Sequence, residues 1–424
     1  MFKRIITKIF ERQAAKLLAK SQPRIVVIVG SVGKTSTKKA IVSVLEQHFR
    51  VVYNEGSYNT ELPVPLTLLR LELPPSLFNP LAWVSLFIKS QNFIQRGADY
   101  DVAVLELGTD TPGDMAKFAS YIQPDVTVIT AIADEHMENF KTLEAVAREE
   151  FLITSNSKVA IINRDDTELI YDHLNRAATI FSYGLTKDCD FQFLKDKFSL
   201  EYGYDGRFFG EGFGELSAQL RVVGEHNIKP AVAAVAVATQ LQMPHDKIAK
   251  GVELIEPVPG RMNLLAGAER SIVLDDSYNS SPISVKAALK TLYGMQASGR
   301  IAILGSMNEL GETSQASHRS VGEHCDSKYL DWVVTVGDEA EKYLAPAAKA
   351  AGCKVESFDS PYEAGAFVRG KLQPGTLVLV KGSQNRIFTE EATKLLLADS
   401  NDEKQLVRQS PKWLQIKHDY FSQL

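Results

Sequence analysis

The chain has 424 residues and a net charge of −5, with 45% hydrophobic and 23% charged residues. These values exclude a disordered chain and indicate a globular protein of two or three domains. The slightly acidic balance gives no reason to expect a nucleic-acid partner. Three widely spaced cysteines favour a reducing compartment and no metal cluster, so we expect a cytoplasmic protein.

Residues 1–22 are predicted to form one amphipathic helix ahead of the first domain. Within residues 2–20 the apolar side chains fall on one helical face, and six Lys and Arg residues accompany a single acid, Glu11. Such a helix packs on its own protein, which we favour, or contacts an anionic membrane or a protein partner. The apolar stretch 77–94 is a second candidate contact surface. No apolar run reaches the roughly 18 residues of a membrane span.

The most informative motif, Gly-Ser-Val-Gly-Lys-Thr-Ser, occupies residues 30–36 directly after the apolar run 25–29. The order predicts a strand, a glycine turn and the start of a helix. Backbone N–H groups of such a turn close on phosphate oxygens, and the helix N-terminus adds positive potential. The lysine reaches the terminal phosphates and the threonine hydroxyl ligates Mg²⁺. We therefore predict a phosphate site at Gly30, Gly33, Lys34, Thr35 and Ser36.

Short apolar runs alternate with helical stretches along most of the chain, which predicts an α/β fold with largely parallel sheets. A P-loop central domain is expected over residues 23–258, and a Rossmann-like C-terminal domain over residues 259–424. The Pro-Val-Pro-Gly-Arg run at 257–261 marks the joint, and residues 179–222 suggest an antiparallel appendage. The predicted strands are 24–29, 101–105, 125–130, 159–162, 271–275, 300–304, 332–336, 354–358 and 376–380.

Polar side chains follow two strands of the predicted central sheet. Glu106 comes after the strand 101–105, and His136 comes shortly after the strand 125–130. Open α/β sheets bind ligands at the carboxyl ends of their strands, so both residues are expected at the same edge as Lys34. Carboxylate, imidazole and hydroxyl groups suit Mg²⁺ or its water ligands. Taken singly, Glu106 can also be a helix cap and His136 an ordinary loop histidine.

Further polar residues end strands of the predicted C-terminal domain. Asp276 suits ribose hydroxyls, and Tyr278 or Asn279 suits a base, although such residues before Ser-Pro are also ordinary turn and cap residues. The strand ending at Lys381 carries a Lys-Gly-Ser run that suits a carboxylate or a phosphate. The remaining candidates of this kind are Asn308, Glu309 and Ser383.

Together these motifs resemble the Mur ligase family, from about residue 24 to about residue 397. The resemblance implies an ATP-dependent ligase that forms an amide bond between a carboxylate, such as a muramoyl-peptide precursor, and an amino acid or dipeptide such as D-alanyl-D-alanine. The reaction would pass through an acyl phosphate, in peptidoglycan and cell-wall biosynthesis. The matching segments are residues 30–35, 59–67, 106–108 with 112–114, 136–140, 224–227, 260–261, 275–279 and 381–383.

The resemblance also implies roles for individual residues. Thr35 and Glu106 would hold one Mg²⁺, and His136 and Glu150 would lie near a second, with Lys34 on the phosphates of ATP. Arg261 and Asp276 would reach the nucleotide only after domain closure, which excludes water from the acyl phosphate. The other implied nucleotide contacts are Asn227, Tyr278 and Asn279, and the implied substrate contacts are Asn59, Asn308, Glu309, Lys381 and Ser383.

Three departures from the family pattern bear on the substrate. The usual N-terminal uridine-binding domain is missing before residue 30. Glu150 stands where many members have a carbamylated lysine, so it serves as a carboxylate substitute or is a solvated helix charge. Pro230 replaces an expected adenine contact. A ligase acting on another acid, such as a polyglutamate or lipid-linked precursor, and a partner-dependent ATP-binding subunit therefore stay open as alternatives, as do the amine and the oligomeric state.

Overall fold

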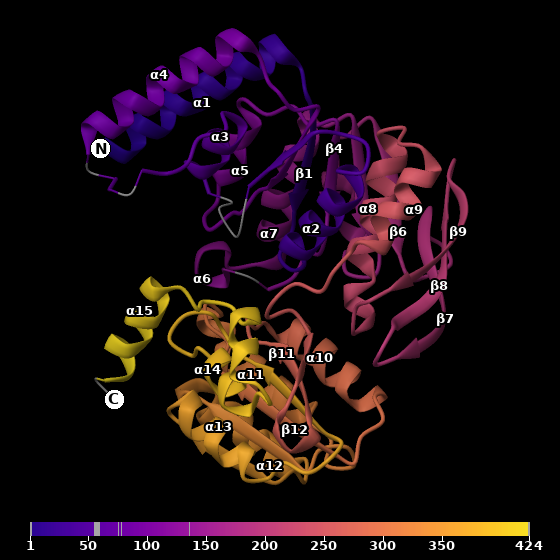
Figure 1. Cartoon of the computed structure of the whole chain (residues 1–424), viewed down its shortest axis with the longest axis vertical. Coiled ribbons are helices and arrows are strands. Elements are labelled where there is room, and N and C mark those ends of the chain that lie inside the picture. The colour runs from indigo at the N-terminus through magenta and orange to yellow at the C-terminus, as the bar shows by residue number, and fades with distance from the viewer. Residues whose placement is uncertain (1, 55–59, 75, 78, 135, 423–424) are drawn as a thin grey trace. The chain divides into compact units, whose positions relative to one another are not determined.

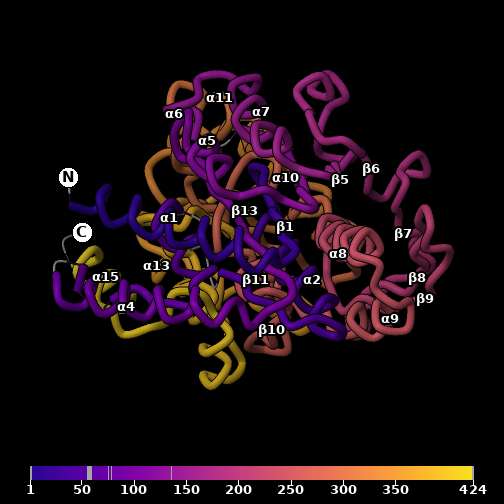
Figure 2. The backbone as a smooth tube through the Cα atoms, turned by 90° about the horizontal axis from the view of Figure 1, so that it is seen from above, coloured from indigo at the N-terminus to yellow at the C-terminus, as the bar shows by residue number. Residues whose placement is uncertain are grey.

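The computed structural model describes residues 2–54, 60–74, 76–77, 79–134 and 136–422, which form two compact units. Unit 1 comprises residues 1–133, 139–221 and 227–256. Unit 2 comprises residues 134–138, 222–226 and 257–424. The chain passes from unit 1 to unit 2 for the last time after residue 256, next to the predicted joint at 257–261. Figure 1 labels the elements of each unit, and Figure 2 traces the same backbone from above.

Unit 1 is built on a nine-stranded sheet within its described residues, in the order β2-β3-β1-β4-β5-β6-β7-β8-β9. Pairing is parallel from β2 through β7 and antiparallel from β7 through β9. The strands are β1 (Arg24–Val29), β2 (Val51–Tyr53), β3 (Val102–Glu106), β4 (Val126–Ile129), β5 (Val159–Asn163), β6 (Thr179–Gly184), β7 (Phe191–Ser199), β8 (Gly203–Gly210) and β9 (Gly214–Leu220).

The central strands of this sheet are covered on both faces. Nearly every residue of β1, β3 and β4 is buried, which explains why each reads as a continuous apolar run. The chain leaves β1 toward β2 and β3 on one side, and β4 pairs on the other side. The carboxyl end of β1 is therefore a topological switch point, the place where open α/β sheets bind ligands.

Residues 179–222 contain the expected antiparallel pairing, in β7 to β9, but these strands extend the central sheet. β6 pairs parallel with β5, and β7 to β9 continue the same sheet. Aromatic side chains stabilise the extension, since the rings of Phe193 and Phe208 pack with centroids 4.8 Å apart across β7 and β8.

Helices pack on the unit 1 sheet where small residues allow close approach. α8 is buried along its alanine-rich sequence and contacts α2. In α9 a side chain at Gly251 would bring a Cβ within 2.5 Å of the Val44 Cα, so glycine is required at this crossing. The helices of this part of the chain are α1 (Phe2–Ser21), α2 (Lys34–Leu45), α3 (Pro63–Leu68), α4 (Pro80–Arg96), α5 (Asp114–Ala119), α6 (Met137–Phe140), α7 (Leu143–Phe151), α8 (Lys229–Gln240) and α9 (His245–Glu253).

The N-terminal helix α1 packs on its own unit, as the sequence predicts. Ile6, Phe10 and Leu17 are buried, and the Phe10 ring lies 5.8 Å from that of Trp83 in α4. Figure 1 shows α1 and α4 side by side. Two residues expected on the apolar face, Phe2 and Ile5, are instead 45% and 53% exposed. They lie in the first turn, ahead of the buried stretch.

Unit 2 contains a six-stranded sheet in the order β10-β11-β15-β12-β13-β14 within its described residues. All neighbours pair in parallel except β10 and β11. The strands are β10 (Asn263–Ala266), β11 (Ile272–Asp276), β12 (Gly299–Gly305), β13 (Trp332–Val336), β14 (Val355–Phe358) and β15 (Thr376–Lys381). The helices are α10 (Pro282–Gly294), α11 (Ser314–Glu323), α12 (Ala345–Ala350), α13 (Pro361–Arg369), α14 (Glu390–Leu396) and α15 (Pro411–Phe421).

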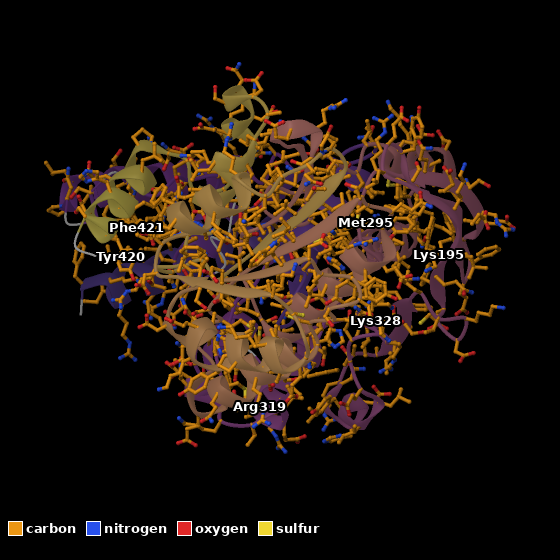
Figure 3. The ribbon with its side chains drawn as sticks, turned by 90° about the horizontal axis from the view of Figure 1, so that it is seen from below. Lys195, Met295, Arg319, Lys328, Tyr420 and Phe421 are labelled. Atoms are coloured by element: carbon orange, nitrogen blue, oxygen red, sulfur yellow. The ribbon has the colours of Figure 1, made fainter. Side chains whose placement is uncertain are left out.

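The last helix, α15, is fixed to unit 2 by aromatic side chains. The rings of Tyr420 and Phe421, labelled in Figure 3, lie 6.2 and 6.0 Å from the ring of Phe388. The expected α/β class, a mostly parallel sheet followed by a Rossmann-like unit, is confirmed. Across the part of the chain that the structure describes, we find no helix with the length and apolar character to cross a bilayer.

Replacing Phe10 by alanine tests whether α1 is an integral part of unit 1. Its ring is 1% exposed, so truncation leaves a cavity and should lower the free energy of unfolding by about 3–5 kcal/mol. Urea denaturation measures this change. Lys16→Ala, at an exposed position of the same helix, is the control and should change the value by less than about 0.5 kcal/mol. If Phe10→Ala lowered the free energy of unfolding as little as Lys16→Ala does, the packing of α1 on unit 1 would not stabilise the protein.

Candidate functional site

The loop between β1 and α2 has the geometry of a phosphate cradle. Gly30 has a φ of 120° and Gly33 a φ of 91°, a conformation that favours glycine. A Cβ at Gly30 would lie 2.5 Å from the Thr130 hydroxyl oxygen. The N-cap of α2 is Gly33, which has no side chain to cap the helix, and the positive end of a helix suits an anion.

Hydrogen bonds from the segment after β4 fix this loop. The Ser31 N–H donates to the Ala131 carbonyl (2.9 Å), and the Ser31 hydroxyl donates to the Ala133 carbonyl (3.0 Å). The half-buried ammonium of Lys34 lies over the loop, where it donates to the carbonyls of Gly30 and Ser31. The lysine is thus held beside the backbone that would surround a phosphate.

A buried carboxylate lies below the loop. The Thr35 hydroxyl donates to Glu106 Oε1 (3.0 Å), and the Lys38 ammonium lies 2.8 Å from Glu106 Oε2. Lys38 and Glu106 are only 1% and 2% exposed. The structure therefore brings Thr35 and Glu106 together, as the sequence predicts, with Lys38 as an additional member.

Asn54, next to the end of β2, completes this cluster. Its side-chain amide donates to the Glu106 carbonyl (3.0 Å) and accepts from the Glu106 N–H (2.9 Å). Its own carbonyl accepts from Lys38 (2.7 Å). Sequence reasoning missed both partners. Lys38 had a signal, because it follows Lys34 by four residues and so shares its helical face. Asn54 had none, because its contact depends on strand pairing.

The oxygen donors of this cluster fit Mg²⁺. Thr35 and Glu106 offer one hydroxyl and one carboxylate, the hard ligands that Mg²⁺ takes together with phosphate oxygens and water. Among the residues described, no group of three or more His, Cys, Asp or Glu side chains converges on one point. A cation held here would therefore take only a few ligands from the protein, which is the usual arrangement for Mg²⁺ on a nucleotide.

Glu150 also contacts the phosphate loop. Its carboxylate, 2% exposed on α7, accepts from the Gly30 N–H (2.9 Å) and from the Thr109 hydroxyl (3.1 Å). The alternative of a solvated helix charge is therefore wrong. The neighbouring Glu149 accepts from the N–H groups of Gly113 (2.9 Å) and Met115 (2.7 Å) at the start of α5. The two adjacent carboxylates thus hold two different loops.

The remaining predicted residues of the central domain lie in helices or outside the described residues. Ser36 lies in the first turn of α2, and Asn227 lies in the short helix Glu225–Asn227 before α8. Pro230 is buried in the first turn of α8. Proline is tolerated there, because N–H groups of the first turn have no hydrogen-bond partner within the helix. Asn59 lies outside the described residues.

His136 belongs to unit 2, where it contacts a loop of the same unit. Its Nδ1 lies 2.9 Å from Glu309 Oε2, and the hydrogen bond from His136 lowers the pKa of the Glu309 carboxyl. His136 has a φ of 50°. The structure thus pairs two of the predicted site residues with each other. A shared edge for His136 and Glu106 stays a prediction.

Lys381 and Asp276 form a buried ion pair in unit 2. The Lys381 ammonium lies 2.7 Å from Asp276 Oδ2 and donates to the Asn279 carbonyl (2.9 Å). Burial lowers the pKa of Lys381, and the charge of Asp276 opposes this effect. Two side chains expected to contact different ligand groups therefore neutralise each other, and they link the ends of β11 and β15.

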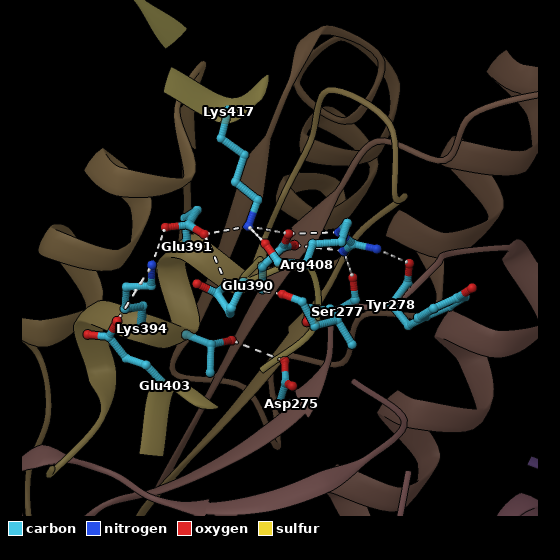
Figure 4. A network of polar contacts seen from close by, with 12 residues as sticks. Asp275, Ser277, Tyr278, Glu390, Glu391, Lys394, Glu403, Arg408 and Lys417 are labelled. Carbon is cyan, nitrogen blue, oxygen red and sulfur yellow. Dashed lines mark hydrogen bonds and ion pairs between the residues drawn. The ribbon is translucent and has the colours of Figure 1, made fainter. Parts of the chain in front are cut away.

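The Tyr278 ring lies beneath an arginine. The guanidinium of Arg261 is 4.3 Å from its centroid, a cation–π contact. Arg408 donates to the carbonyls of Tyr278 (2.9 Å) and Ser277 (2.7 Å) and forms a buried pair with Glu390 (Figure 4). Sequence reasoning missed Arg408 and Glu390, which lie more than 100 residues from Tyr278 and carry no local motif.

A buried histidine supports the loop that carries Asn308 and Glu309. The Met307 N–H donates to His318 Nε2 (2.9 Å), and the Asn308 N–H donates to the Ser383 hydroxyl (2.9 Å). Burial lowers the pKa of His318 below its ordinary 6.5. His318 therefore fixes the loop in its neutral form, because a protonated Nε2 cannot accept a hydrogen bond.

Lys38→Met should destabilise unit 1 by about 3–5 kcal/mol, because it leaves the Glu106 carboxylate buried without its cation. Adding Glu106→Gln to the same chain removes that charge and should recover much of the loss. Urea denaturation of the two single variants and the double variant measures the coupling. Additive effects of the two substitutions would contradict the pairing.

His318→Gln should remove part of the acid sensitivity of unit 2. Because the folded pKa is depressed, the contribution of His318 to stability is complete above pH 6.5 and is lost as pH falls below that value. Glutamine also accepts from an N–H but does not titrate. The stability difference between wild type and variant should therefore narrow from pH 7.5 to 5.5 in urea denaturation. His173→Gln, at an exposed position, is the control; parallel curves for wild type and His318→Gln would refute this role.

Comparison with known proteins identifies the family. The family model of the Mur ligase middle domain matches residues 28–238, and that of the Mur ligase, glutamate ligase domain matches residues 260–384. The UDP-N-acetylmuramoyl-tripeptide–D-alanyl-D-alanine ligase of Escherichia coli (strain K12) is 30% identical over 342 residues, which cover 78% of this chain and 68% of the relative. The Haemophilus influenzae protein of the same name is 29% identical over 404 residues, covering 93% of this chain and 81% of the relative.

Solved structures agree with this comparison. A crystal structure of MurF from Acinetobacter baumannii matches with a TM-score of 0.75 at 25% identity, covering 91% of this chain and 79% of that chain. MurF from Thermotoga maritima in complex with ADP, at 23% identity, shares the fold with a TM-score of 0.74 over 92% of this chain and 84% of that chain. The chain belongs to the Mur ligase family of ATP-dependent ligases, which form carbon–nitrogen bonds.

Proposed function

We propose that this ligase joins D-alanyl-D-alanine to the free carboxylate of a UDP-N-acetylmuramoyl tripeptide. The names of the Escherichia coli and Haemophilus influenzae relatives supply this substrate pair. The observation that carries the chemistry is the contact between Thr35 and Glu106 beneath the Lys34 loop, since it sets a phosphate cradle beside two hard oxygen donors.

The proposed reaction has two steps. An oxygen of the substrate carboxylate attacks the γ-phosphorus of ATP, the bond to the β,γ-bridging oxygen breaks, and ADP leaves. The amine of the dipeptide then attacks the acyl carbon, phosphate leaves with the electron pair of the carbon–oxygen bond, and the nitrogen loses a proton. Phosphoryl transfer requires positioning and charge neutralisation more than covalent help from the protein.

The residues of unit 1 suit the first step. The Gly30–Gly33 loop and the start of α2 would bind the phosphates, and the Lys34 ammonium would neutralise charge that develops on the transferred group. Thr35 and Glu106 would hold Mg²⁺, which supplies further neutralisation of phosphate charge. Glu150 keeps the Gly30 N–H in place, and we retain it with His136 as a candidate for a second Mg²⁺.

We also retain the nucleotide and substrate roles expected for unit 2 as proposals. Arg261 and Tyr278 form a stacked pair of the kind that contacts a base or a ribose, and Asp276 lies at the adjoining strand end. Asn308, Glu309 and Ser383 lie on two neighbouring loops, which suits contact with the peptide part of a substrate.

The test is ADP release by the full chain with ATP, Mg²⁺, UDP-N-acetylmuramoyl tripeptide and D-alanyl-D-alanine. Release should require both the acid and the amine, and mass spectrometry should find the joined product. Lys34→Ala should reduce turnover by at least 100-fold, because the loop loses the cation that would neutralise charge on the transferred phosphate. Lys39→Ala, at an exposed position of the same helix, is the matched control and should retain activity.

Three outcomes would contradict the proposal or the role given to the loop. Turnover only with another acid, or only with single amino acids, would place the chain among ligases of different specificity. ATP binding without amine-dependent ADP release by the chain alone would favour a partner-dependent subunit. Full activity of Lys34→Ala would contradict the role given to the loop.

A further inference from the structure

Helix α1 presents a strongly cationic exposed side. Its buried side packs on unit 1 through Ile6, Phe10 and Leu17. The six cationic residues of the helix are all exposed, and helical spacing puts most of them away from this buried side: Lys3, Arg4, Lys8, Arg12, Lys16 and Lys20. The helix has a single acid, Glu11, which is buried and paired with Lys8 (2.8 Å). This exposed side therefore carries positive charge along the whole helix.

Helix α4 presents an apolar exposed side. Leu81, Val84 and Ile88 follow one another at helical spacing and are 78%, 55% and 54% exposed. Its opposite side is buried at Trp83 and Ser90. The helix has no acidic residue and two cations, Lys89 and Arg96. Large aliphatic side chains this exposed along one stripe are unusual on a surface that faces only water.

The two helices are joined into one surface. The Gln91 amide donates to the Gln13 carbonyl oxygen (2.8 Å), and the Lys20 ammonium donates to the carbonyls of Ile94 (3.0 Å) and Gln95 (2.7 Å). With the Phe10–Trp83 contact, these bonds hold α1 and α4 side by side along their length (Figure 1). We call the exposed residues of both helices the α1–α4 face.

We propose that the α1–α4 face binds the surface of an anionic lipid bilayer. Eight Lys and Arg residues against one Glu lie on these two helices, in a chain with a net charge of −5. This concentration of cations complements anionic headgroups, and the aliphatic stripe of α4 matches the boundary between headgroups and acyl chains. The helices would lie in the interface rather than cross it, in agreement with the absence of a spanning helix among the described residues.

The proposal is independent of the ligase chemistry. Unit 1 carries both the phosphate loop and the α1–α4 face, so membrane binding would bring the ATP site to the bilayer surface without using any of its residues. A water-soluble nucleotide substrate does not require this location.

Vesicle sedimentation of the full chain tests the proposal. The vesicles are phosphatidylcholine alone or phosphatidylcholine with 30% phosphatidylglycerol, each at low and at 0.5 M salt. We expect binding to the anionic vesicles only, with at least tenfold weaker binding at high salt. The triple variant Leu81→Ser, Val84→Ser, Ile88→Ser should bind at least tenfold more weakly. A second triple variant, Lys3→Gln, Arg4→Gln, Arg12→Gln, should also bind the anionic vesicles at least tenfold more weakly.

Matched controls separate this face from general surface effects. Leu169→Ser, Ile170→Ser removes aliphatic side chains that are 70% and 62% exposed elsewhere in unit 1 and should leave binding unchanged. A second control removes three exposed cations from the same unit: Lys187→Gln, Lys197→Gln, Lys250→Gln. It should also leave vesicle binding unchanged. ADP release without vesicles should be the same for every variant, which shows that each is folded.

Three results would overturn the proposal. The first is absence of wild-type binding to the anionic vesicles. The second is equal binding to both kinds of vesicle at both salt concentrations. The third is self-association of the chain that the α4 variant abolishes in the absence of vesicle binding, which would assign the face to a protein contact.

Discussion

The candidate site depends on the ion pair and hydrogen bond of the buried Glu106 carboxylate with Lys38 and Thr35. A carboxylate at 2% exposure is costly unless it is paired and hydrogen-bonded, and here Lys38 and Thr35 from α2 supply the partners. Asn54, next to the end of β2, bonds the backbone N–H and carbonyl of the same residue. Because α2 begins at the phosphate loop, these bonds fix the loop to the edge of the sheet. Glu150 fixes the other end of the loop through the Gly30 N–H.

Unit 2 follows the same physical rule with different residues. Asp276 is neutralised by Lys381 at the strand ends. Glu390 pairs with both Arg408 and Lys417 (Figure 4), which holds the C-terminal segment to the rest of the unit. Burial acts most plainly on Asp275, where it raises the pKa to about 6. In both units, therefore, charged groups removed from water are used to position loops.

The predicted strands agree with the structure to within one residue at each end, because buried parallel strands read as unbroken apolar runs. The conformation of the glycine loop and the family, with its ATP-dependent ligase activity, were also predictable, since local motifs encode them. The Thr35–Glu106 contact was predictable because both residues follow buried strands whose carboxyl ends lie at one edge of the sheet. β2 and β10 were missed, because β2 has only three residues and β10 is a partly buried strand at the edge of its sheet. The partners Asn54 and Arg408 were missed because only tertiary pairing brings them to the site.

The central claim is that the Lys34 loop and the Thr35–Glu106 cluster bind the phosphates of a nucleotide together with Mg²⁺. Calorimetric titration of the full chain with a non-hydrolysable ATP analogue, with and without Mg²⁺, tests it most directly, because it measures binding without turnover. The account predicts one site per chain, at least tenfold weaker binding without Mg²⁺, and no Mg²⁺ effect in Thr35→Val. Binding that is indifferent to Mg²⁺ and to this substitution would contradict it.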